Sequence, residues 1–203
     1  EQFPPENATE RRLMDRDLHL SRFRDDSLPA SERRAAIAQA NDILEQTIAE
    51  NPDDPRRFDW LYALAHSLIY DEGAPHATKI LYIDGSEEDR QSLREVSRRA
   101  LSAARTLIAR LEEEFARIDT LTPGQFRRIE DDGYLAELDR LAPSADYLLL
   151  WALFYDALPK DSGDPARAAQ LREVLTRLAA DPLVLQSPHE QTRVQIPATL
   201  LAG

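Results

Sequence analysis

Apolar residues in this chain recur at steps of three and four positions, which is the spacing of one face of an α-helix. In the run 32–49, four apolar residues from Ile37 to Ile48 fall on one such face. The run 87–119 carries a longer series of the same kind. Strand-like alternation is confined to short stretches such as 194–196, too brief to form a sheet. The pattern therefore predicts an all-α protein.

Polar caps and prolines indicate where these helices begin. Ser86 with Asp89, and Thr122 with Gln125, have the spacing of a capping box, in which two side chains satisfy backbone N–H groups at the helix N-terminus. Such signals predict seven helices, with an interruption at 73–75 and with or without a break at Gly133. The predicted starts are Ser31, Asp54, Ser86, Thr122, Ser144, Asp164 and Ser187.

The two ends of the chain differ from the middle. Residues 1–28 are predicted to form an N-terminal extension, in which a charged helix over 9–24 lies against the rest. Residues 29–203 are predicted to form a helical-repeat domain. The apolar stretch 198–202 stops without the polar closing cap that an array of helices needs, so the natural chain is expected to continue beyond residue 203.

Two segments of the chain look alike. Residues 57–71 and 144–156 each have an aspartate followed by a large aromatic residue, a dense apolar stripe and a Tyr-Asp pair. Intervals of about 20 to 36 residues between predicted helix starts are typical of repeated helix pairs. Further repeat-like positions are Ala36, Ala40, Ala49, the 51–55 turn (Asn-Pro-Asp-Asp-Pro), Trp60, Leu64, Ala65 and Ala77.

Through these residues the chain resembles tetratricopeptide-like α-solenoid proteins. The resemblance implies antiparallel helix pairs stacked into a curved superhelix. It also implies that the concave face binds peptides or partner proteins.

The net charge of the chain limits the classes of partner that it is expected to bind. There are 37 acidic and 25 basic residues, so the net charge is −12, and no segment is basic. Because a phosphate backbone is bound by clustered Lys and Arg, nucleic-acid binding is disfavoured, as is docking on an anionic membrane surface. No apolar run approaches the roughly 18 to 20 residues that cross a bilayer, so no membrane insertion is predicted. The compartment stays open between the cytoplasm and an exported location after signal removal.

Candidate chemistry is sparse. The chain has no cysteine, which excludes disulfides, thiolate zinc sites and a cysteine nucleophile. His66 and Tyr70 are four positions apart on one predicted helix, beside Asp71 and Glu72, so an imidazole and a phenol share a face. A histidine half-buried beside an aromatic stripe is the favoured interpretation. No metal-ligand spacing and no phosphate-binding glycine loop occurs, and no cofactor is predicted.

The residues expected to contact a partner combine an aromatic ring with a charge at equivalent positions of the two similar segments. They are Tyr70, Asp71, Tyr155 and Asp156, together with His66. An acidic groove built around them would select a protein or peptide partner with basic segments.

Three functional hypotheses follow. The first is a protein- or peptide-binding scaffold built on a helical repeat. The second is an all-helical enzyme or metal-binding domain centred on His66 and Tyr70. The third is an architectural or dimerisation segment of a longer protein, in which the long helix from Glu87 forms the dimer seam.

Overall fold

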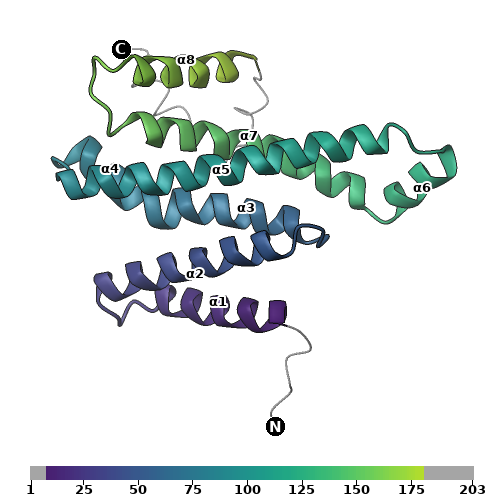
Figure 1. Cartoon of the computed structure of the whole chain (residues 1–203), viewed down its shortest axis with the longest axis horizontal. Coiled ribbons are helices and arrows are strands. Elements are labelled where there is room, and N and C mark those ends of the chain that lie inside the picture. The colour runs from purple at the N-terminus through teal and green to yellow at the C-terminus, as the bar shows by residue number, and fades with distance from the viewer. Residues whose placement is uncertain (1–7, 181–203) are drawn as a thin grey trace, which may run out of the picture.

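A computed structural model describes residues 8–180 as helices joined by short connections (Figure 1). No strand occurs in this part of the chain, which confirms the predicted all-α class. The elements are α1 (Ala8–Arg24), α2 (Ala30–Glu50), α3 (Arg57–Ser67), the π-helical turn η1 (Leu68–Gly73), α4 (Ala74–Tyr82), α5 (Glu87–Ile118), α6 (Pro123–Asp131), α7 (Tyr134–Ala157) and α8 (Pro165–Ala180).

The helices form a row in the order of the sequence. α1 packs against α2, α2 against α3, α3 against α5, α5 against α7 and α7 against α8 (Figure 1). The short helices α4 and α6 lie near the two ends of α5. Because α5 lies in the middle of the row, α3 and α7 cover it from two sides.

The helix α5 begins with the predicted capping box. The Ser86 hydroxyl accepts a bond of 3.1 Å from the Asp89 N–H, and the Asp89 carboxylate accepts one of 3.3 Å from the Ser86 N–H. Its apolar stripe is buried along almost the whole helix, which explains why so charged a segment is stable here. The buried apolar side chains are Leu93, Val96, Ala100, Leu101, Ala103, Ala104, Leu107, Leu111 and Ile118.

The predicted helix start at Ser144 is wrong. α7 begins after Gly133, whose φ of 74° stops α6, and it continues through Pro143. A proline inside a helix costs about 3 kcal/mol. Leu138 and Leu141 are both almost fully buried in the core. Burial of each side chain stabilises the folded protein by about 1.5–3 kcal/mol. Packing therefore outweighs the local stop signal.

The predicted interruption at 73–75 is also absent. The chain stays helical through η1, a π-helical turn in which the backbone hydrogen bonds span five residues rather than four. It then passes directly into α4. Pro75 lies in the first turn of α4, where its missing N–H has no helical partner to lose. The predicted short helix from Pro75 to Tyr82 is thus present, but without a break before it.

The other predicted starts fall close to observed ones. Those at Ser31, Asp54, Ser86, Thr122 and Asp164 lie within three residues of the first residues of α2, α3, α5, α6 and α8. The predicted N-terminal helix is present as α1. The predicted start at Ser187 and the apolar end of the chain lie outside the described residues. None of the helices described here is long and apolar enough to span a membrane.

Candidate functional site

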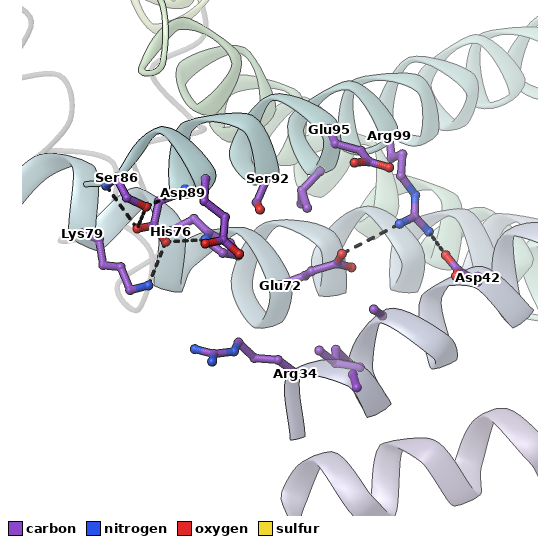
Figure 2. Close-up of a pocket in the computed structure, with 15 residues that line it drawn as sticks. Arg34, Asp42, Glu72, His76, Lys79, Ser86, Asp89, Ser92, Glu95 and Arg99 are labelled. Atoms are coloured by element: carbon purple, nitrogen blue, oxygen red, sulfur yellow. Dashed lines mark hydrogen bonds and ion pairs between the residues drawn. The ribbon is translucent and has the colours of Figure 1, made fainter. Parts of the chain in front are cut away.

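A polar groove of about 590 Å³ lies between α2 and α5, with η1 and α4 along its base (Figure 2). It draws on four elements that are separated in the sequence and meet only in the folded protein. The charged and polar residues that line it are Arg34, Asp42, Glu72, His76, Lys79, Ser86, Glu88, Asp89, Ser92, Glu95 and Arg99.

One end of the groove is held by an ion-pair network around Arg99. Its guanidinium lies 2.6 Å from the Asp42 carboxylate, 3.0 Å from Glu45 and 3.8 Å from Glu72. Burial lowers the pKa of Arg99, but these three carboxylates outweigh the burial and raise it. The buried amide of Asn41 donates a 2.8 Å hydrogen bond to Glu72. The network therefore ties α2, η1 and α5 together across the groove.

The other end is held by the carboxylate of Asp89. The Lys79 ammonium lies 2.7 Å from it, the His76 Nδ1 lies 2.9 Å from it, and the Ser86 hydroxyl donates a 2.8 Å bond to it. Hydrogen bonds from Lys79, His76 and Ser86 keep the pKa of Asp89 well below its ordinary value. Asp89 is therefore an ionised clamp between α4 and α5, and the capping box serves both the helix and the groove.

Three charged side chains that line the groove have no partner within the described residues. Glu88 and Glu95 are exposed on α5, and Arg34 is exposed on α2. Within the described part of the chain, none of these three side chains has a hydrogen bond or ion pair. Figure 2 shows Ser92 and Glu95 on one side of the groove and Arg34 on the other.

The expected partner-contact residues do not line this groove. The rings of His66 and Tyr70 lie 4.5 Å apart, and Tyr70 meets Trp151 edge to face at 6.3 Å. His66 and Tyr70 thus share a face as predicted, in a row of aromatic rings between α3, η1 and α7. Asp71 is half-buried.

Tyr155 and Asp156 are buried, with exposed fractions of 5% and 8%. The Asp156 carboxylate accepts bonds from Lys160 at 2.5 Å, from Ser97 at 3.3 Å and from Gln170. Burial raises the pKa of Asp156, but the hydrogen bonds from Lys160 and Gln170 outweigh it and lower the pKa. Asp71 and Asp156 therefore lie in different environments despite their similar sequence contexts.

Sequence reasoning missed the groove residues. The positions 88, 92, 95 and 99 follow a helical stripe on the polar side of α5, and that spacing was available from the sequence. The stripe alone resembles any solvated helix face. This stripe differs from an ordinary solvated face only because α2 lies opposite it and closes a groove. No pattern within α5 itself reveals that. No cluster of residues in the described chain has the composition of a metal site.

The fold and the groove define this chain as an all-helical protein with a mixed-charge polar groove along its central helix. No protein-family model matches the sequence, and no curated protein or solved structure is detectably similar to it.

Proposed function

We propose that this chain is a protein- or peptide-binding module and that the α2/α5 groove receives the partner. The observation that carries the proposal is the combination of a groove of about 590 Å³ with walls that are held rigid by internal ion pairs. Rigid walls reduce the ordering cost of binding, so more of the contact free energy appears as affinity.

The proposal includes an α-solenoid-type architecture of antiparallel helix pairs, as the likeness to tetratricopeptide-like proteins suggests. The row of helices in sequence order supports it, because each helix packs mainly on its neighbours, as in repeat arrays. The net charge of −12 supports a basic partner, since a strongly acidic protein attracts cationic segments over a long range.

The enzymatic hypothesis at His66 and Tyr70 has less support. Neither residue lines the α2/α5 groove. Neither lines a second cavity of about 330 Å³, which lies between residues 52–61 and the 110–117 stretch of α5. Both rings instead belong to a row of aromatic contacts that runs from Tyr62 through Trp151 to Tyr155. A dimer seam along α5 also has less support, because its apolar stripe is covered within the chain.

The test compares two double variants that change the net charge equally. Glu88→Lys with Glu95→Lys alters the groove, whereas Glu112→Lys with Glu130→Lys alters exposed carboxylates away from it. Each variant and the wild type are immobilised, and proteins retained from a lysate of the source cells are identified by mass spectrometry. We expect a protein bound by the wild type and the control variant but lost from the groove variant. Retention of the same proteins by all three, or of none, contradicts the proposal.

A further inference from the structure

We propose that the α2/α5 groove recognises an extended peptide segment in which two basic residues are three positions apart. The inference rests on the proposed function, because it specifies the chemistry of the partner at the same groove. It assigns Glu88 and Glu95 as the two specificity-determining residues and Arg34 as the residue that faces the peptide backbone.

The ion pairs within the groove indicate that its ligand carries cationic side chains. Asp42 and Glu72 already pair with Arg99, and Asp89 already pairs with Lys79. Glu88 and Glu95 are the groove carboxylates without such a partner in residues 8–180. An incoming Lys or Arg therefore finds its counter-charge at these two positions rather than at the occupied network.

The spacing of the two glutamates selects the conformation of the ligand. They are separated by two helical turns of α5, or about 10 Å along the axis. In an extended polyproline-type segment, residues three positions apart point the same way and are about 9 Å apart. Two basic side chains in that register reach Glu88 and Glu95 together.

The backbone of an extended segment suits the groove better than that of a helix. A helix uses its own carbonyl oxygens in its internal hydrogen bonds, so few of them can accept a bond from the groove. An extended chain is thinner and leaves its carbonyl oxygens free, and the unpaired guanidinium of Arg34 on the opposite wall is a donor for them.

The probes are short synthetic peptides with a fluorescent label. Pro-Lys-Pro-Pro-Lys-Pro places both lysines on one side of a polyproline helix, and Pro-Lys-Pro-Lys-Pro-Pro has the same composition in the wrong register. Pro-Glu-Pro-Pro-Glu-Pro reverses the charges. Binding is measured by fluorescence anisotropy at low and high salt, with the wild type, the groove variant and the control variant of the preceding subsection.

We expect the first peptide to bind the wild type more tightly than the wrong-register peptide, and more weakly as salt is added. The groove variant should lose about tenfold in affinity for it and gain affinity for the glutamate peptide. The control variant should bind like the wild type. The double variant Glu88→Gln with Glu95→Gln introduces no new charge and should also lose affinity for the first peptide. It keeps the test valid if the lysine variant does not fold.

Equal binding of the two lysine registers, or no lysine-peptide binding at concentrations up to the millimolar range, overturns the inference. If a cellular partner is nevertheless lost specifically from the groove variant, the proposed function stands and only the ligand chemistry is wrong. If neither the peptides nor any partner depends on the groove, both proposals are wrong.

Discussion

Asn41 in α2 and Glu72 in η1 are joined by a hydrogen bond of 2.8 Å across 31 positions of the sequence. Asn41 has only 1% of its surface exposed, and Glu72 also faces Arg99 of α5. The π-helical turn that carries Glu72 replaces a predicted break in the chain. Irregular turns of this type are frequent at functional sites, and here the turn delivers a carboxylate to the base of the groove.

We expect Asn41→Leu to destabilise the protein by about 1–3 kcal/mol, because it leaves the partly buried Glu72 carboxylate with one fewer hydrogen-bond donor. The measurement is urea unfolding followed by circular dichroism. Gln39→Leu, at an exposed position of the same helix, is the matched control and should change stability far less. Equal stability of the Asn41 variant and the wild type would show that the bond contributes nothing.

Gly73→Ala is predicted to destabilise the protein by about 1–3 kcal/mol through overpacking. A Cβ at this position would lie 2.8 Å from the Leu68 carbonyl oxygen and 3.2 Å from the ring of Tyr155. Gly124→Ala is the control, since a Cβ added at this position would meet no atom within 4 Å apart from its own chain neighbours. Thermal unfolding of the two variants should separate them clearly. A Gly73 variant as stable as the Gly124 variant contradicts the close packing of η1 on α7.

The ionisation of Asp89 makes the stability of the folded protein depend on pH. Its pKa in the folded protein is lowered by Lys79, His76 and Ser86, whereas in the unfolded chain it is about 3.9. The ionised carboxylate therefore contributes stability above that unfolded value. This contribution is lost as the pH falls through the folded-state pKa.

Asp89→Asn should accordingly be less stable than the wild type at neutral pH, and the difference should shrink as the pH is lowered from about 5 to about 2. Urea unfolding across this pH range makes the measurement. Asp131→Asn, at an exposed position of α6, serves as the control and should follow the wild type. A difference at Asp89 that stays constant with pH would contradict the ionised clamp.

Charge removal at Asp156 and Asp71 should have unequal effects. We expect Asp156→Ala to cost about 1–3 kcal/mol, because Lys160, Ser97 and Gln170 each lose one hydrogen-bond acceptor in a largely buried position. Asp71→Ala at its half-buried position should change stability by less than about 0.5 kcal/mol. Differential scanning calorimetry of the two variants is the test. Equal melting temperatures would contradict the structural role of Asp156.

The mistakes of the sequence-based interpretation have a common cause. Ser144 after Pro143 has the local chemistry of a helix start, yet its hydroxyl bonds the Arg140 carbonyl at 3.0 Å inside α7. Asp156 follows a tyrosine as Asp71 does, yet α8 supplies Gln170 to bury it. In both cases, packing of α7 into the core outweighs a preference that acts over three or four positions.

The sequence by itself determined the helical class, most helix starts and the capping box of α5, because apolar period and capping act between residues close in the chain. Only the tertiary structure decided which polar residues form a groove. Arg34, Glu72 and Glu95 belong to three different elements, and packing of α2 and α5 on η1 brings them together. A polar helix face looks the same in the sequence whether it meets water or another wall, so its role depends on packing.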